Sequence, residues 1–251
     1  MSERRQRPAL TAIQALTGGQ VVPRHWHDQN QIVYASQGVL SVETEAGVWV
    51  TPAHRAIWVP AGVLHQHRSY GRTDLLTVAV PEAIEMPSHP TVLAVNPLLR
   101  ELLLAYAQPP HTEGPTRGHM LTLLVDLLAP APDRALHLPT PRDPRLVEAQ
   151  RLIMDEPSTL TEVAARVGAS PRHLTRLCRE ELGLSFVHWR TQLRLHHALQ
   201  LLAHGESVTT VALRCGWATP SAFIDVFRRQ LGFTPGRRSA PNPPDVTQGT
   251  P

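Results

Sequence analysis

The chain has 251 residues, of which 42% are hydrophobic, and this is enough for two domains that each bury a core. All 24 positively charged side chains are arginine, so enzymes that need a lysine Schiff base or the lysine of a phosphate-binding loop are excluded. The net charge of +3 is uneven, because residues 1–142 carry 11 arginines and 11 acidic residues, whereas residues 157–238 carry 11 arginines and 5 acidic residues. We therefore expect only the rear of the chain to meet a polyanion.

The cellular setting follows from what the sequence lacks. Two cysteines, Cys178 and Cys215, are too few for a disulfide framework or a cysteine-rich zinc module. The opening MSERRQRPAL has no apolar stretch typical of a signal peptide, and no apolar run approaches the roughly 20 residues that cross a bilayer. We expect a cytoplasmic protein without a membrane partner.

Residues 18–80 show a short alternating pattern that predicts β-strands. The apolar runs are QIVYAS, VLSVETE, VWVTP, RAIWVPAG and LLTVAV, separated by Gly38, Gly47, Pro60 and Gly62. Short gaps favour antiparallel pairing, so we predict a small barrel or sandwich as the first domain, residues 1–85.

A helical hairpin is predicted at residues 94–130, with helices over Pro97–Ala107 and His119–Leu128. One side of the first helix is apolar and consists of Leu98, Leu99, Leu102, Leu103 and Tyr106. This side either caps the barrel or forms a homodimer contact.

The proline-rich stretch at 131–145 predicts a linker. The next domain, 146–238, has the period of helices throughout, and 239–251 is predicted to be a disordered tail. The predicted helices are Leu146–Asp155, Leu160–Val167, Pro171–Leu182, Phe186–Ala203, Val208–Cys215 and Pro220–Leu231, with a short turn near Pro235–Arg238.

An internal repeat lies within this domain. TLTEVAARVGASPRHLTRLCREELGLS aligns with SVTTVALRCGWATPSAFIDVFRRQLGFT at an offset of 48 to 49 residues. Each copy predicts a helix-turn-helix, in which Ser170–Pro171 and Thr219–Pro220 supply an N-cap hydroxyl followed by proline. Phe186–Ala203 joins the copies as a strut of roughly 27 Å.

The second helix of each copy is predicted to enter the major groove of double-stranded DNA. Leu174, Leu177, Phe223 and Phe227 are predicted to be core. The DNA-contacting candidates are Arg172, Thr175, Arg176 and Arg179 in the first copy and Ser221, Asp225, Arg228 and Arg229 in the second. Trp189, Trp217, His196 and His197 are predicted to have packing or surface roles.

Residues 145–238 resemble the DNA-binding domain of the AraC/XylS family of transcription regulators, whose signature runs along VALRCGWATPSAFIDVFRRQLGFTPGRR. The resemblance implies a sequence-specific regulator that binds promoter or operator DNA, with activation through RNA polymerase more common than repression. Two residues depart from the family pattern. Asp225 stands where arginine or another polar residue is usual, and Cys178 replaces a core residue that is commonly aromatic.

The front domain resembles the cupin barrel. His25-Trp26-His27 followed by Gln31, and Pro60-Ala61-Gly62-Val63-Leu64-His65, match its two motifs. His25 and His27 share one face of a strand, so His25, His27, Gln31 and His65 are candidate ligands of one divalent transition metal. Gln31 departs from the usual glutamate and removes a negative charge, so a small organic effector or an unused polar cavity stays open as an alternative. His54 and His67 are predicted to lie on the surface.

The sequence thus predicts a multidomain α+β chain: a cupin-like (jelly-roll-like) β-barrel with a helical hairpin, then an all-α double helix-turn-helix domain. We interpret it as a one-component transcription regulator that senses a small molecule or a metal. A metal-dependent cupin enzyme with an accessory helical domain and a non-specific architectural DNA binder are the competing interpretations.

Overall fold

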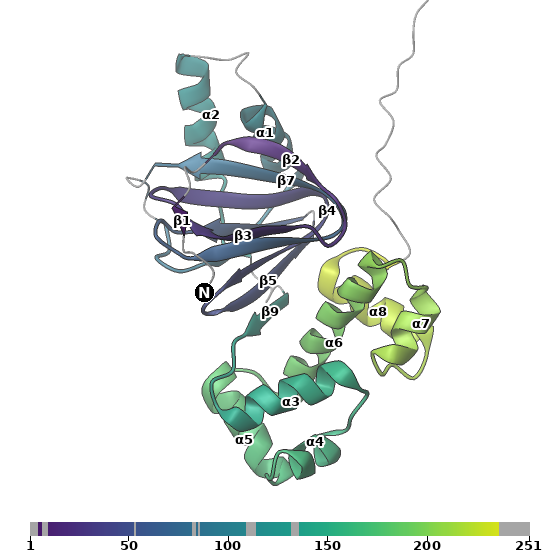
Figure 1. The fold of residues 1–251 in the computed structure, drawn as a ribbon. Helices are drawn as coiled ribbons and strands as arrows, with labels where there is room; N and C mark the ends of the chain where they lie inside the picture. Colours follow the sequence, from purple (N-terminus) through teal and green to yellow (C-terminus); the bar gives the residue numbers. More distant parts are fainter. Residues whose placement is uncertain are drawn as a thin grey trace, which may run out of the picture.

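The computed structural model describes residues 5–6, 10–52, 54–81, 84, 86–108, 114–131 and 136–235. A β-barrel forms the N-terminal part and helices form the C-terminal part (Figure 1). The strands are β1 (Arg5–Gln6), β2 (Ala12–Leu16), β3 (Val21–Trp26), β4 (Asn30–Thr44), β5 (Gly47–Pro52), β6 (Arg55–Val59), β7 (His65–Val80), β8 (Thr91–Ala94) and β9 (Leu136–Pro139). The helices are α1 (Pro97–Ala107), α2 (Pro115–Asp126), α3 (Pro144–Asp155), α4 (Leu160–Arg166), α5 (Pro171–Leu182), α6 (Phe186–Ala203), α7 (Val208–Arg214) and α8 (Pro220–Leu231).

The barrel is organised around two long strands, β4 and β7. Over the described residues the strands form one sheet in the order β1-β3-β7-β4-β5-β9, while β2 pairs with β7 and β6 pairs with both β4 and β8. Strands β4 and β7 run antiparallel from Asn30 opposite Val80 to Thr44 opposite His65. Because β2, β3, β5 and β6 each pair directly with one of these two strands, this pair fixes their register in the barrel.

The two segments expected as separate strands, 31–36 and 39–45, are one strand interrupted by a bulge. The register between β4 and β7 shifts on both sides of Gln37, and the next residue, Gly38, has φ +82°. A Cβ atom on Gly38 would lie 2.4 Å from the carbonyl oxygen of Arg72. Glycine is required here because an L side chain has neither the backbone conformation nor the space.

The helical hairpin packs against one face of the sheet. Leu99, Leu103 and Tyr106 of α1 are buried with Leu124 of α2 against residues of the sheet. Leu98 remains 59% exposed. The apolar side predicted for α1 is therefore divided, with most of it capping the barrel and Leu98 facing outward.

The segment expected as a linker is partly a strand. Residues 136–139 form β9, which pairs antiparallel with β5, and α3 begins at Pro144. The last strand of the sheet is therefore contributed by residues that follow the hairpin in sequence. Strand β9 covers the edge of β5 and leads into the helical domain (Figure 1), and α6 contacts both β7 and β9. The predicted turn near Pro235–Arg238, beyond Pro235, and the predicted tail at 239–251 lie outside the described residues.

The helical domain has two cores that share α6. Ala164, Leu174 and Trp189 are fully buried in the core formed with α3, α4 and α5. Phe223 and Phe227 are fully buried in the core formed with α7 and α8. Four helix predictions match the observed bounds (α1, α5, α6 and α8), and the remaining ones differ at their ends. No helix within the described ranges is both long and apolar enough to span a bilayer.

The bulge at Gly38 generates a stability prediction. Gly38→Ala combines a positive φ with backbone overlap, so we expect it to lower the free energy of unfolding by about 3 kcal/mol. Gly19 has φ +79° with nothing near its missing Cβ atom. Gly19→Ala should therefore cost only about 1 kcal/mol in the same urea titration. Equal costs for the two variants would show that overlap with Arg72 is unimportant.

Candidate DNA-binding surface and sensor pocket

Each helix-turn-helix unit is defined by the same local signals. The Ser170 side chain caps the first turn of α5, and the Thr219 side chain caps the first turn of α8. Both second helices end at a left-handed glycine, Gly183 with φ 66° and Gly232 with φ 80°. The cap and the terminating glycine satisfy backbone groups at both helix ends, so short helices of fixed length are presented to solvent.

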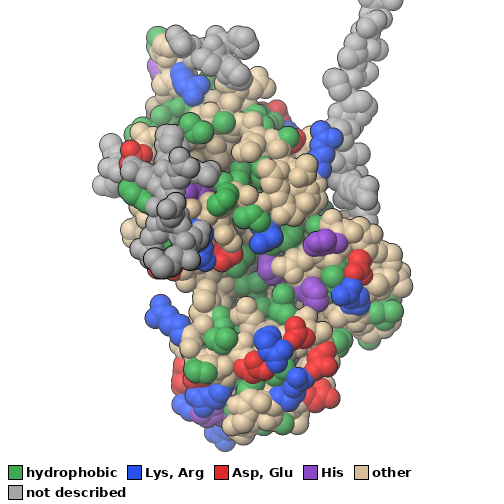
Figure 2. Space-filling view, viewed as in Figure 1, with side chains coloured by type: hydrophobic (Ala, Val, Ile, Leu, Met, Phe, Trp, Pro, Cys, Tyr) green, Lys and Arg blue, Asp and Glu red, His purple; other side chains and the backbone are tan. Residues whose placement is uncertain are grey.

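The first recognition helix presents three arginines. Arg172, Arg176 and Arg179 are exposed on α5, whereas Thr175 is half-buried and its hydroxyl donates to the carbonyl of Pro171 at 2.9 Å. A hollow of about 550 Å³ follows this face. Its lining residues are Leu160, Ser170, Pro171, Arg172, His173, Thr175, Arg176 and Arg179. In Figure 2, arginine side chains gather over α5 at the lower end of the molecule.

Neighbouring groups that sequence reasoning missed also hold α5. Arg145 at the start of α3 forms an ion pair with Asp143 at 2.7 Å, and its Nη1 atom lies 3.0 Å from Nε2 of His173. Hydrogen bonds from Arg145 lower the pKa of Asp143 to about 2. The backbone amide of Asp143 donates to the carboxylate of Glu181, near the other end of α5. Both ends of α5 are therefore fixed to the segment that enters the domain, a contact that no local sequence pattern reveals.

The second recognition helix carries a mixed surface. Ser221, Asp225, Arg228 and Arg229 are all exposed on α8, while Phe223 and Phe227 face the core. Their spacing places the first three on one side of the helix. Asp225 puts a negative charge on this surface, next to the two arginines, which makes α8 less attractive to phosphates than α5.

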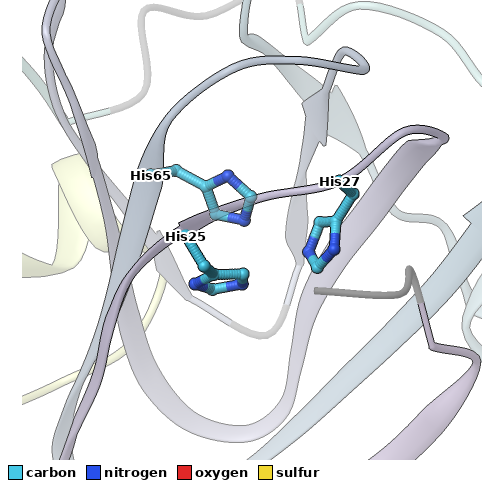
Figure 3. Close-up of side chains that lie close together, drawn as sticks. All are labelled: His25, His27 and His65. Atoms are coloured by element: carbon cyan, nitrogen blue, oxygen red, sulfur yellow. The ribbon is translucent and has the colours of Figure 1, made fainter. Parts of the chain in front are cut away.

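The barrel brings together His25 of β3, His27 directly after β3 and His65 of β7. The imidazole centroids of His25 and His65 are 4.4 Å apart, and that of His27 lies 4.7 Å from His25 and 5.2 Å from His65. All three side chains are buried. The potential ligand atoms of these three residues lie within 4.8 Å of one another, and the rings point toward one another (Figure 3).

Hydrogen bonds to the backbone fix the orientation of two of these rings. Nδ1 of His25 lies 2.8 Å from the carbonyl of Pro23, and Nδ1 of His65 lies 2.8 Å from the carbonyl of Val63. A carbonyl only accepts, so each Nδ1 carries the proton and each Nε2 has a lone pair. Burial lowers the pKa of His65 to about 3, so the imidazole is neutral near pH 7.

Gln31 and His67 complete the pocket. Gln31 on β4 is 3% exposed, and its Oε1 atom has no hydrogen-bond partner among the residues described. A cavity of about 170 Å³ adjoins these side chains. Its lining residues are Leu10, Ala12, Gln14, Val22, His25, His27, Gln31, His67, Leu75 and Thr77.

Two of the predicted surface histidines lie elsewhere. His67 is 2% exposed and its ring centroid lies 5.0 Å from that of His65, so the prediction that it lies on the surface was wrong. His67 lies two residues after His65 along β7, so its side chain faces the same side of the sheet. His54 is half-buried, and it lies beside Gly232 at the end of α8.

The nitrogen and oxygen donors of the pocket suit a divalent transition metal. His25 and His65 offer oriented Nε2 lone pairs, His27 supplies a third imidazole nearby, and Gln31 supplies a buried carbonyl oxygen. Imidazole nitrogen suits zinc, copper, iron and nickel, and backbone hydrogen bonds to the opposite ring nitrogen are the usual way of orienting such ligands.

Comparison with known proteins agrees with this two-part organisation. Residues 7–152 match the family model of the AraC-like ligand binding domain, and residues 163–238 match that of a helix-turn-helix domain. The first match covers the barrel, the hairpin and the start of the helical domain, and the second covers both recognition helices.

Individual relatives are named as regulators of transcription. The chain is 34% identical over 221 residues to the HTH-type transcriptional regulator NimR of Escherichia coli, covering 86% of this chain and 81% of that protein. It is 32% identical over 94 residues to the HTH-type transcriptional activator RhaR of Klebsiella pneumoniae, covering 37% and 34%. A solved AraC-type regulator from Chromobacterium violaceum is 32% identical over 39% of this chain and 95% of that one, at a TM-score of 0.35.

The assignment rests on the sequence matches, which point to regulators rather than to metal-dependent cupin enzymes. The chain belongs to the AraC family of DNA-binding transcription regulators, with an N-terminal AraC-like ligand-binding domain.

Proposed function

We propose that this regulator binds promoter DNA through both recognition helices and senses a divalent transition metal at His25, His27 and His65. It acts in the cytoplasm as a homodimer and activates transcription by contacting RNA polymerase. The observation that carries the sensor assignment is the convergence of three buried imidazoles with two of their tautomers set by the backbone.

For DNA, the exposed arginines carry the proposal. Arg172 and Arg176 lie in the N-terminal half of α5, the half that faces base edges when such a helix enters the major groove. The guanidinium group forms paired hydrogen bonds with guanine and also binds phosphate. On α8, Arg228 and Arg229 lie nearer the C-terminal end and suit phosphate contacts. Thr175 contributes through its methyl group, because its hydroxyl donates within the helix.

Arg176→Ala tests this surface. We expect the variant to weaken binding to the specific site by about 1–3 kcal/mol, because a base or phosphate contact is lost. Arg176 also contacts Glu180 at 3.3 Å, an exposed pair whose loss has little effect on stability. Quantitative shift assays at fixed salt give the affinity, and Arg24→Ala, an exposed paired arginine of the barrel, is the control.

The same assay separates a regulator from an architectural DNA binder. A regulator should bind its site at least about 10³-fold more tightly than random DNA at physiological salt. Unchanged affinity for Arg176→Ala would remove this residue from the interface. Equal affinity for all sequences would contradict the whole proposal of specific recognition.

For the sensor, the donor set favours a metal that prefers nitrogen. Three neutral imidazoles and one amide bring no negative charge, so a bound dication keeps its charge and attracts an anionic or electron-rich molecule into the adjoining cavity. The cavity of about 170 Å³ admits only a small molecule or a few waters.

Removal of two ligands tests the metal. Gently purified protein should contain close to one metal ion per chain by elemental analysis, and Zn²⁺ should raise its melting temperature, because the metal binds the folded state. The pair His25→Ala with His65→Ala should lose the metal and the shift. The pair His119→Ala with His204→Ala, both exposed, serves as the control. Metal-free protein that shows no response to Zn²⁺, Cu²⁺, Ni²⁺ or Fe²⁺ would leave a small organic effector as the alternative.

The homodimer is proposed to form through the outer face of the hairpin. Leu98 of α1 and Leu123 of α2 are 59% and 45% exposed, while their neighbours are buried against the barrel. A second copy of the same face would remove both leucines from water.

Leu98→Arg with Leu123→Arg tests the dimer. We expect sedimentation equilibrium to show a dimer for the parent chain and a monomer for the double variant, since each copy would bury two arginines without partners at the symmetric interface. The control Val187→Arg changes an exposed apolar residue on α6. A parent chain that sediments as a monomer would contradict the proposed dimer.

A further inference from the structure

The two helix-turn-helix units are attached to the barrel in different ways. The first unit follows β9 directly, and β9 is hydrogen-bonded to β5 through four residue pairs from Gly47 opposite Pro139 to Val50 opposite Leu136. Val48 and Leu138 pack into the same core as α3, α4 and α5. This unit is therefore fixed to the sheet by backbone pairing as well as by side chains.

The second unit is held by side chains. Val39, Val50 and Tyr70 of the barrel are buried in one cluster with α7, α8 and the C-terminal half of α6 from Leu195 onward, whereas the N-terminal half of α6 belongs to the core of the first unit. Figure 1 shows α6 and α8 beside the barrel, near the ends of β4, β5 and β7. At the C-terminal end of α8, Gly232 lies against the ring of His54. No strand pairing joins this unit to the sheet within the described part of the chain.

A partly buried hydrogen bond forms part of this contact. The hydroxyl of Tyr70 is 2.7 Å from Nε2 of His196 on α6 and 3.2 Å from Oγ of Ser41 on β4. With one proton, the hydroxyl donates to one of these groups and accepts from the other. Burial lowers the pKa of His196 to about 4, so the ring is neutral, and separating it from Tyr70 would remove one hydrogen bond from both side chains.

The same two strands carry the sensor pocket and this contact. Strand β7 contains His65 and His67 at its start and Tyr70 five residues after His65, roughly 17 Å along an extended strand. Strand β4 contains Gln31, which lines the pocket, and Ser41, which binds Tyr70. If an occupant of the pocket displaces β7 or β4, the same strand therefore also moves Tyr70 or its partner Ser41.

We propose that the Tyr70–His196 contact transmits occupancy of the histidine pocket to the second helix-turn-helix unit, while the first unit stays fixed to the barrel through β9. Tyr70 and His196 are positioning residues, since neither touches DNA or the pocket. The inference rests on the proposed function of the pocket as the effector site. It makes the spacing between the two recognition helices the quantity that the effector controls, because only one of them changes its position on the barrel.

Distances between spin labels test the proposal in the full chain. One pair, Ala46→Cys with Leu213→Cys, reports the second unit, and the other, Ala46→Cys with Val147→Cys, reports the first; all three positions are exposed. The native cysteines, Cys178 and Cys215, are buried, so labelling is selective. With one equivalent of ZnCl₂ as the probe, we expect the first pair to change its distance distribution and the second pair to keep it.

Substitutions at Tyr70 and His196 test whether this contact controls the distance change. Tyr70→Phe should increase the population of the displaced second unit about 10-fold without zinc and abolish most of the zinc response. Tyr106→Phe, a buried tyrosine of α1 outside this cluster, is the matched control and should behave like the parent. His196→Leu combined with Tyr70→Phe should add little to either change, because both remove the same bond.

Each alternative outcome has a distinct meaning. If zinc binds and neither pair changes, or both pairs change together, the proposal is overturned. If zinc does not bind, the proposed metal site fails, and the zinc-free comparison of Tyr70→Phe with Tyr106→Phe still decides the contact. An unchanged distribution for Tyr70→Phe in that comparison overturns the inference by itself.

Discussion

The antiparallel pairing of β4 with β7 is the constraint on which the rest of the molecule depends. It positions the inner-facing histidines of β7 opposite the strand that carries Gln31, and it presents Tyr70 and Ser41 on the outside of the same two strands. A shift of this register by one residue would exchange the inner and outer faces and destroy both arrangements together. The bulge at Gly38 fits this role, because it bends β4 without allowing the pairing to slip.

Local sequence signals were sufficient for the helical half. Proline after a capping hydroxyl and glycine after the last turn gave the ends of α5 and α8 correctly, because these signals act within a few residues. The AraC-type domain could be identified from its repeated pattern for the same reason. These signals carry no information on which surface each helix packs against. The contacts of Arg145 with His173 and of Tyr70 with His196 are examples, because they join residues that are 28 and 126 positions apart.

The barrel half was harder to predict where polar residues face inward. The start of β7 reads HQHRSYGRTD, which has no alternation of apolar and polar residues, so this strand was predicted only from Leu75 onward. Its inner face lines a polar pocket rather than an apolar core, and a period-two pattern in hydrophobicity is absent there. His67 was misplaced for this reason. The grouping of His25, His27 and His65 could be predicted because the motif supplies the strand position directly, whereas the DNA contacts assigned to α5 and α8 remain proposals.

Strand β9 sets a limit on how this protein can be divided. Residues 136–139 belong to the sheet by hydrogen bonding, yet they follow the hairpin and immediately precede the helical domain. A fragment that stops before Leu136 would leave the edge of β5 uncovered, and an open strand edge is a template for pairing with another chain. A fragment that starts after Leu136 would instead remove the strand from its sheet and leave Leu138 without the sheet residues it packs beside. The sensing and DNA-binding halves therefore share one strand, and a cut within the segment that joins them either uncovers the edge of β5 or removes β9 from its sheet.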